Sequence, residues 1–301
     1  MKKISAYSLY ILIAAILWGF DGILRRNLYV LPPMIIVFYE HLIGLILLTP
    51  MIPALLKKEK LTQKEWLSIV FVSLLSGLLG TLWFTTALIK TNFISFSVVF
   101  LLQKLQPIFT VITANIILKE KISKKYISWA LLAFAAAYFV TFKNGIINFQ
   151  TGEGTIIAAL FAVAAAFAWG SSTAFSRFTL INHSNTLITG LRFFFTTLFS
   201  LVGVYLYRME PQLLSVDTKQ LSQLLIIALS TGMFALWLYY KGLKHTQAKI
   251  STILELAFPL TAIIIDVFVY KNILAPTQYL AAVVLIFAIF KISQLNKNST
   301  K

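Results

Sequence analysis

The chain has 301 residues, of which 59% are hydrophobic and only 12% are charged, and its mean hydropathy is +0.85. Soluble domains carry about 25% charged residues, so this composition excludes a soluble protein and favours an integral membrane protein, whose apolar side chains face lipid. A net charge of +16 would favour nucleic acid in a soluble protein, but in a membrane protein it is typical of Lys-rich and Arg-rich cytoplasmic loops. The absence of cysteine excludes disulfides, thiol catalysis and Cys-based metal sites.

The first apolar stretch, YSLYILIAAILWGF at 7–20, lacks an A-x-A cleavage site and continues too far for a signal peptide, which predicts a retained first span. A helix needs about 20 apolar residues to cross the hydrocarbon core. By that measure the chain predicts an all-α integral membrane protein with ten transmembrane helices and no separate soluble domain. The ten segments are 7–29, 34–56, 65–89, 94–118, 124–142, 154–177, 186–208, 220–243, 248–270 and 275–294.

Basic residues are distributed unevenly over the connections between these segments. Most of the 26 Lys and Arg residues fall on the side of the membrane that holds the N-terminus, as in LKKEKLTQKE at 56–65, and Lys104 and Arg192 lie within spans. Because cytoplasmic loops carry the excess of Lys and Arg, both termini are predicted to lie in the cytoplasm.

The two halves of the sequence are alike. AAILWGF (14–20) matches AAFAWGS (165–171), LLSGLLGTLWF (74–84) resembles ALSTGMFALWL (228–238), and LQPIFTVITANIILKEKIS (105–123) resembles AFPLTAIIIDVFVYKNILA (257–275). Each half holds five spans, an odd number, so the second half enters the membrane upside down. The sequence therefore predicts two inverted five-helix repeats, 7–142 and 154–294, joined by a short linker at 143–153, a common construction of secondary transporters.

These features together resemble the drug/metabolite transporter superfamily, and within it the EamA-type transporters with two tandem EamA domains. They are the ten spans, LWG in the first helix, AWG in the sixth, a mid-helix proline in spans four and nine, and ILKEKIS after span four. The resemblance implies a bacterial inner-membrane carrier of metabolites or amino acids. It also implies a central cavity lined by spans one to four and six to nine, with spans five and ten at the periphery.

The sequence departs from the family pattern at two places. The family usually has an Arg early in spans two and seven; Arg192 fits, but Glu40 stands at the matching place in the first half. The glutamate after span four is present as Glu120, but its counterpart in the second half is Asn272.

Lys104 lies in the middle of an apolar span, between Gln103 and Gln106, and Pro107 follows. An ionisable group at membrane depth costs about 2.5–3.5 kcal/mol and usually faces a cavity or an opposite charge. Lys104 is therefore predicted either to line a cavity or to form a buried ion pair that holds the bundle together.

Two prolines mark equivalent points of the repeats. Gln103 precedes Pro107 by four residues, and Glu255 precedes Pro259 by four. Proline has no amide hydrogen, so the carbonyls of Gln103 and Glu255 lose their helical partners, and an opened backbone beside polar side chains can bind a polar group. We predict a quasi-symmetric substrate site that contains Gln103, Lys104 and Glu255. The alternative is that both helix-breaking prolines only bend their helices.

Two further charged residues, Glu40 and Arg192, occupy equivalent positions in spans two and seven. They are predicted either to pair with each other or to hold opposite ends of a zwitterionic substrate. His41 is a candidate proton carrier because its ordinary pKa lies near neutrality, and the alternative is a hydrogen-bonded structural role. The candidates for proton coupling are Glu255, Glu40 and His41.

Other charged and aromatic residues in the spans are predicted to form ion pairs, helix contacts or a cavity wall. Asp21 and Arg25 are spaced to form an ion pair on one helix, whereas Arg25 and Arg26 can also extend to the interface. Trp18 and Trp169 precede glycines, which favours close helix packing. The aromatic residues predicted to form a cavity wall and contact substrate are Trp83, Trp237, Tyr239 and Tyr240.

These observations favour a secondary transporter that moves a small organic metabolite across the membrane by alternating access, with its site at the midplane between the repeats. The chain lacks a G-x-x-x-x-G-K-[ST] motif, so it has no ATPase of its own, and no cofactor or metal is expected. Lys104 and Glu255 together suit an amino acid or a related compound; if they pair with each other, an exporter of apolar, aromatic or drug-like compounds is favoured. An enzyme acting on lipid-linked substrates and a non-transporting scaffold are remote alternatives. The apolar stretch 281–290 leaves monomer and homodimer open.

Overall fold

The computed structural model describes residues 5–25, 28, 30–90, 102–147, 155–268, 271 and 273–296, and these residues contain helices and no strands. The first half forms α1 (Ala6–Arg25), α2 (Pro33–Leu48), α3 (Ile52–Lys58), α4 (Gln63–Val72), the π-helical segment η2 (Ser73–Gly80), α5 (Thr81–Lys90), α7 (Gln106–Leu118), α8 (Lys124–Thr141) and the short turn η3 (Lys143–Gly145).

The second half repeats this order. It forms α9 (Thr155–Leu180), α10 (Asn185–Leu206), α11 (Glu210–Leu213), α12 (Thr218–Leu229), α13 (Met233–Leu243), α14 (Ala248–Leu254), the 3-10 turn η4 (Glu255–Ala257), α15 (Phe258–Phe268) and α16 (Pro276–Ser293). The all-helical membrane fold is therefore confirmed for the described part of the chain.

Six continuous helical stretches in the described residues are long and apolar enough to cross a membrane, or seven if the bent pair α2 and α3 counts as one. Ten spans were expected. The others are shorter or interrupted: α7 has 13 residues, and η4 separates α14 from α15. The beginning of the expected span 94–118, up to residue 101, lies outside the described residues.

One expected span is wrong in shape. The segment 34–56 was predicted as a single helix, but α2 ends at Leu48 and α3 continues at an angle of 65°. The bend falls at residues 49–51, next to Pro50 and Pro53, and proline in the interior of a helix removes one backbone hydrogen bond. Thr49 adds to the turn because its hydroxyl donates to the Leu45 carbonyl over 2.8 Å.

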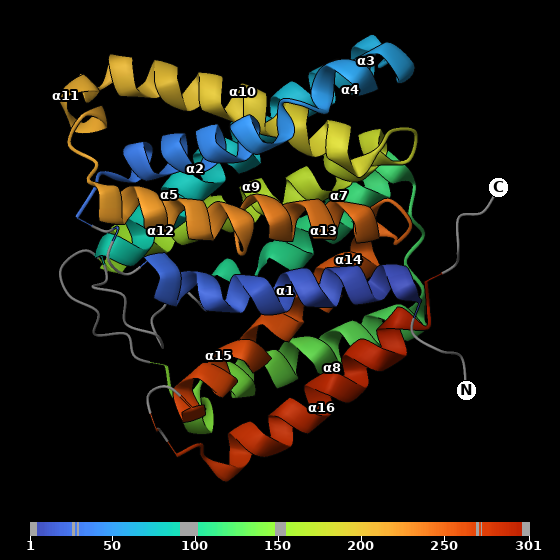
Figure 1. Ribbon diagram of the computed structural model, residues 1–301. Coiled ribbons are helices and arrows are strands. Elements are labelled where there is room, and N and C mark those ends of the chain that lie inside the picture. Colours follow the sequence, from blue (N-terminus) through green and yellow to red (C-terminus); the bar gives the residue numbers. More distant parts are fainter. Residues whose placement is uncertain are drawn as a thin grey trace.

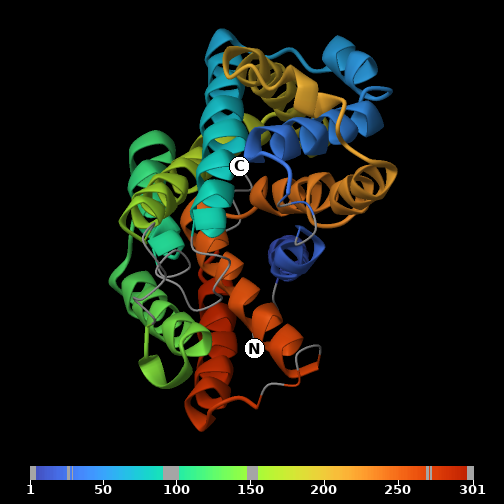
Figure 2. The ribbon, with the colours of Figure 1, turned by 90° about the vertical axis from the view of Figure 1, so that its left-hand side faces the viewer.

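The helices of the two halves pack in reciprocal pairs. Helix α7 of the first half lies against α9 of the second half, and in the same way α14 and α15 of the second half lie against α1 of the first. Helix α5 also lies against α9, as α13 lies against α1. α2 pairs with α10, and α8 pairs with α16 at the other side of the bundle (Figures 1 and 2). In the pairs α2–α10 and α8–α16 the two helices come from equivalent places of the two repeats, and each of the other contacts has a reciprocal counterpart, as a two-repeat architecture requires.

Glycines allow two of these pairs to approach closely. A Cβ at Gly170 on α9 would lie 2.5 Å from the backbone oxygen of Gln106 on α7. A Cβ at Gly19 on α1 would overlap the side chain of Thr261 on α15. The packing role predicted for the two Trp-Gly pairs is therefore confirmed for their glycines.

Both ends of the described chain lie at one end of the bundle, which is called the N/C end below (Figure 1). The ring of Tyr7, near the start of α1, lies 4.0 Å from the ring of His245, in the turn between α13 and α14. Asn296, after α16, donates to the carbonyl of the same histidine over 3.2 Å. The start of α1, the turn after α13 and the end of α16 therefore mark one side of the molecule.

Candidate substrate-binding site

The two predicted helix breaks are present. Residues 104 and 105 form a turn before α7, whose first turn contains Pro107. The 3-10 turn η4 interrupts the other helix at Glu255–Ala257, and Pro259 is the second residue of α15. Each break lies directly before its proline because proline cannot donate to the carbonyl four residues earlier.

The two breaks meet through polar side chains. Gln106 Nε2 donates to Glu255 Oε2 over 2.9 Å, and Gln103 Nε2 donates to Gln106 Oε1 over 3.1 Å. The Tyr239 hydroxyl on α13 donates to the other carboxylate oxygen, Glu255 Oε1, over 2.6 Å. Gln103, Gln106, Tyr239 and Glu255 form what is called the central cluster below, with members from both repeats.

Aromatic rings and a lysine surround the central cluster. The Trp18 ring on α1 lies 5.2 Å from the Tyr239 ring, and Lys104 Nζ lies 5.4 Å from the centre of the Phe258 ring. Although Glu255, Gln106 and Trp18 belong to interior helices, all three are partly accessible. Partly accessible polar groups between flat rings can bind a ligand that is both polar and aromatic.

Lys104 is 5% exposed, yet within the described residues no carboxylate lies within 4 Å of its amino group. The alternative in which Lys104 and Glu255 form a direct ion pair is therefore wrong for this structure. The reason is geometric: Gln106 and Tyr239 occupy the carboxylate, while the lysine lies over Phe258. A lysine amino group beside the cluster, without a carboxylate partner among the described residues, can interact with an electron-rich group of a ligand.

Glu40 and Arg192 do not pair with each other, so that alternative is also wrong. Arg25 Nη2 donates to Glu40 Oε1 over 2.8 Å, whereas Arg192 donates to the Tyr240 hydroxyl over 2.7 Å and to the Ser76 hydroxyl over 2.9 Å. The cause is competition from other partners. α2 and α10 run in opposite directions, and each side chain is occupied by a different neighbour: Glu40 by Arg25 at the end of α1, and Arg192 by Tyr240 on α13 and Ser76.

A buried charge group lies at the end opposite the N/C end. Arg25 pairs with Asp21 one helical turn earlier, as the spacing predicted, and Asp21 accepts from the Thr231 hydroxyl over 2.6 Å. Arg25 and Glu40 are 9% and 6% exposed. The group therefore connects α1, α2 and the start of α13; Arg26 lies outside the described residues.

The remaining predicted site residues have separate positions. His41 Nδ1 lies 2.8 Å from the Val37 carbonyl of its own helix, and its ring lies 4.8 Å from that of Phe193. Trp237 donates to the Thr186 hydroxyl over 2.9 Å, which places its indole between α13 and the start of α10. Trp83 is half-buried on α5. The substrate contacts predicted for Trp83, Trp237 and Tyr240, and the proton transfer predicted for His41, stay predictions.

Sequence reasoning placed Gln106 in the polar stretch that was predicted to form one half of the site, but did not name it among the substrate-binding residues. It also did not find the partners of Glu120, which binds Arg177 and the start of α14. The signal for Gln106 was its place next to the proline, directly in the helix break. For Arg177, 57 residues from Glu120, the sequence carries no local signal.

The structure has helices of membrane-spanning length in two similar halves. Each half contains a broken helix, and polar side chains join the two breaks. These features define a multi-pass membrane transporter built of two repeats. The model of the EamA-like transporter family matches the chain twice, over residues 5–142 and 156–294. The chain belongs to the EamA-like transporter family, and it is a transporter of small organic molecules rather than an enzyme.

Similar proteins agree with this assignment. The chain is 38% identical over 292 residues to the riboflavin transporter ImpX of Fusobacterium nucleatum subsp. nucleatum (strain ATCC 23726 / VPI 4351), a match that covers 96% of this chain and 98% of that protein. It is also similar to a protein of known crystal structure, with a TM-score of 0.72 at 16% identity, over 98% of this chain and 99% of the other. The second match establishes the fold alone.

Proposed function

We propose that this protein is a secondary transporter that carries riboflavin or a closely related flavin across the cytoplasmic membrane by alternating access, with the central cluster as its binding site. The observation that carries the proposal is the 38% identity, over almost the whole of both chains, to a riboflavin transporter.

The chemistry of the central cluster supports a flavin. The isoalloxazine ring is flat and uncharged, and its pyrimidine edge carries two carbonyl oxygens with an N–H between them. The amides of Gln103 and Gln106 supply donors for the carbonyls, and the Glu255 carboxylate is an acceptor for the N–H. The rings of Trp18 and Phe258 lie beside these groups and are suited to stacking on the ring system.

An amino acid remains a second candidate because of Lys104. The lysine and Glu255 lie on the two broken helices without forming an ion pair, so a zwitterion could bind with its carboxylate toward Lys104 and its amino group toward Glu255. A flavin uses the same lysine differently, as a donor to a ring carbonyl or nitrogen. Both ligands use the same residues, so a binding measurement is needed to distinguish them.

The N/C end is proposed to be the cytoplasmic end. The connection between α3 and α4, which carries Lys57, Lys58, Lys60 and Lys64, lies there: Glu59 in this connection accepts from the backbone N–H of Ser184 over 2.7 Å, in the turn after α9. Because Lys and Arg are enriched on the cytoplasmic side, this end faces the cytoplasm.

The test is a binding titration that uses the fluorescence of riboflavin, which is quenched when the ring stacks on tryptophan. Purified protein in detergent is expected to quench riboflavin saturably, and Glu255→Gln is expected to weaken the affinity roughly tenfold or more because a hydrogen bond to a charged group is lost. Glu65→Gln is the matched control, since Glu65 is a buried carboxylate that caps α4 and accepts from Asn182, outside the central cluster. No saturable quenching, together with stabilisation of the protein by amino acids, would favour the second candidate.

A further inference from the structure

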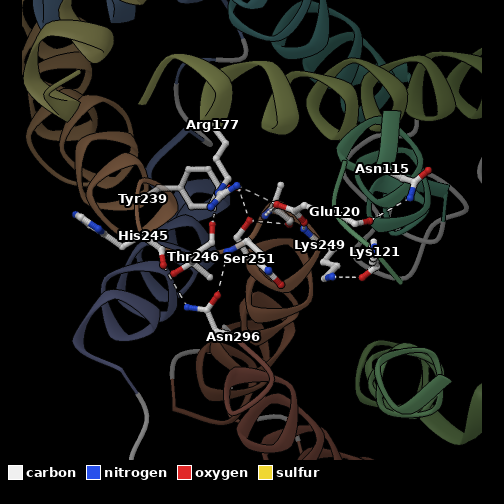
Figure 3. Close-up of polar contacts among 12 residues, drawn as sticks. Asn115, Glu120, Lys121, Arg177, Tyr239, His245, Thr246, Lys249, Ser251 and Asn296 are labelled. Carbon is white, nitrogen blue, oxygen red and sulfur yellow. Dashed lines mark hydrogen bonds and ion pairs between the residues drawn. The ribbon is translucent and has the colours of Figure 1, made fainter. Parts of the chain in front are cut away.

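At the N/C end the side chain of Glu120 crosses from the first repeat to the second and accepts three hydrogen bonds there (Figure 3). Its Oε1 accepts from the backbone N–H of Ala248 over 2.8 Å and from Arg177 Nη1 over 3.1 Å, and its Oε2 accepts from the backbone N–H of Lys249 over 3.1 Å. Arg177 Nε in turn donates to the Thr246 carbonyl over 2.7 Å. Glu120, Arg177 and the first turn of α14 are called the N/C lock below.

The backbone aims Glu120 at α14. Lys119 ends α7 in the left-handed conformation, with φ of 54°, and the Glu120 N–H donates to the Ala114 carbonyl over 3.2 Å. The Glu120 carbonyl accepts from Asn115 over 3.1 Å, so the residue is fixed to the end of its own helix. Its carboxylate then meets the N-terminus of another helix, where unpaired N–H groups and the helix dipole favour a negative charge.

Because this contact is buried, breaking it without admitting water would cost free energy. Glu120 is 6% exposed and Arg177 is 5% exposed. The Tyr126 hydroxyl, at the start of α8, also donates to the Lys249 carbonyl over 2.7 Å. If α7 and α14 separated without water reaching this end, a carboxylate and two backbone N–H groups would lose their partners, so separation and the entry of water are coupled.

The N/C lock lies directly below the central cluster along both helices that carry it. α14 runs for seven residues, about 10 Å, from Ala248 in the lock to the residue before Glu255. α7 begins at Gln106 in the cluster and ends just before Glu120. The same two helices are therefore joined twice, by Gln106 and Glu255 at the cluster and by Glu120 at the N/C end. Ser251, between these points on α14, is 0% exposed.

The opposite end is built differently. Within the described residues, Arg25 at the end of α1 pairs with Asp21 and Glu40, which come from α1 and α2 of its own repeat. The sequence counterpart of Glu120 in the second repeat is Asn272, which carries no charge. Residue 272 lies outside the described residues; within them, the carboxylates at the opposite end pair with Arg25 of their own repeat, and Asp21 reaches the other repeat through the Thr231 hydroxyl.

We propose that the N/C lock is the gate that closes the path from the central cluster to the N/C end, and that it must open for substrate to be exchanged there. The proposal rests on the alternating access in the proposed function, but it does not depend on the identity of the substrate. Bound ligand replaces the contact between Gln106 and Glu255, and the lock then holds α7 and α14 together alone.

The test measures access to a thiol placed above the lock. The chain has no cysteine, so Ser251→Cys introduces a single reactive group between the lock and the central cluster. Vesicles with the N/C end outward are treated, without substrate, with a maleimide that does not cross membranes. Adding Glu120→Gln is expected to raise the labelling rate on the order of tenfold, the range of typical conformational couplings. Arg177→Lys, which keeps the charge and loses the guanidinium fork, is expected to raise the rate by a smaller factor.

Two controls separate gate opening from unfolding. Glu65→Gln removes another buried carboxylate at the N/C end and is expected to leave the rate unchanged. Ser200→Cys places a thiol at a fully buried position on α10, and its labelling is expected to stay slow with Glu120→Gln. Equal labelling at positions 251 and 200, or an unchanged rate at position 251 in both lock variants, would overturn the proposal. Because no substrate is added, a failure of riboflavin to bind would leave this result unaffected.

Discussion

At Gly170 the two repeats touch with almost no side chain between them, and substitution there tests the geometry of the binding site. A Cβ on this residue would lie 2.5 Å from the Gln106 backbone oxygen, 2.8 Å from Phe109 Cβ and 3.2 Å from the Thr110 backbone nitrogen. These atoms belong to α7 itself and cannot rotate away. Gly170→Ala therefore forces α7 to move from α9 by about 1 Å, the difference between 2.5 Å and ordinary contact at 3.4 Å.

The magnitude follows from the cost of overpacking. Such strain typically costs about 1–3 kcal/mol, which corresponds to several degrees in Tm for a chain of this size. The shift also moves Gln106 away from Glu255, whose contact is 2.9 Å, so flavin affinity is expected to fall together with stability. Gly190→Ala is the matched control, because a Cβ there meets the end of the flexible Ile52 side chain, which can rotate.

The assay is thermal unfolding of the purified protein in detergent, combined with the riboflavin titration. Gly170→Ala is expected to unfold several degrees below wild type and to bind riboflavin more weakly, while Gly190→Ala stays close to wild type in both. Equal stability of the two variants would show that α7 does not lie against α9 as described, and would refute the reasoning.

Three further predictions follow from single contacts. Tyr239→Phe removes the hydroxyl that donates to Glu255 and is expected to weaken riboflavin binding roughly tenfold in a quenching titration, whereas Tyr240→Phe, whose hydroxyl contacts Ser176 and Arg192, is expected to affect mainly stability. Arg25→Met leaves Asp21 and Glu40 without their cation and is expected to lower the free energy of unfolding by about 3–5 kcal/mol. Adding Glu40→Met should recover part of this loss in a thermal unfolding assay. Full stability of the single variant would contradict the buried pairing. Burial, together with Lys244 and Arg177, lowers the pKa of His245 below 6.5, so the folded protein binds this proton less readily than the unfolded chain does. Tm should therefore fall as the pH drops below 6.5. His245→Gln should reduce that fall, and an identical pH dependence of Tm in the variant would exclude the histidine as its source.

Local chemistry made the membrane fold and the helix breaks predictable. The apolar runs and the matched segments at 14–20 and 165–171 indicated two repeats of membrane-crossing helices. Proline imposes its effect on the backbone whatever surrounds it, so the breaks before Pro107 and Pro259 could be placed to within a few residues.

Contacts between repeats were less predictable because they depend on depth and direction. Glu40 and Arg192 are equivalent in sequence, but Arg25 occupies Glu40, and Arg192 donates to Tyr240 and Ser76 instead. Glu120 was recognisable as a residue of the family pattern, yet its partner Arg177 had been counted only as one of many basic residues at the end of a span. Such pairings are fixed by helix packing, which one sequence does not encode locally.

The most direct measurement is the uptake of radiolabelled riboflavin into vesicles that contain the purified protein and are loaded with unlabelled riboflavin. Wild type is expected to accumulate label by exchange, and Gln106→Ala to exchange on the order of tenfold more slowly, because it removes the amide that contacts Glu255. Glu65→Gln should exchange like wild type. Absence of riboflavin exchange in vesicles whose protein exchanges an amino acid would contradict the flavin assignment, and equal exchange by wild type and Gln106→Ala would contradict the central cluster as the site.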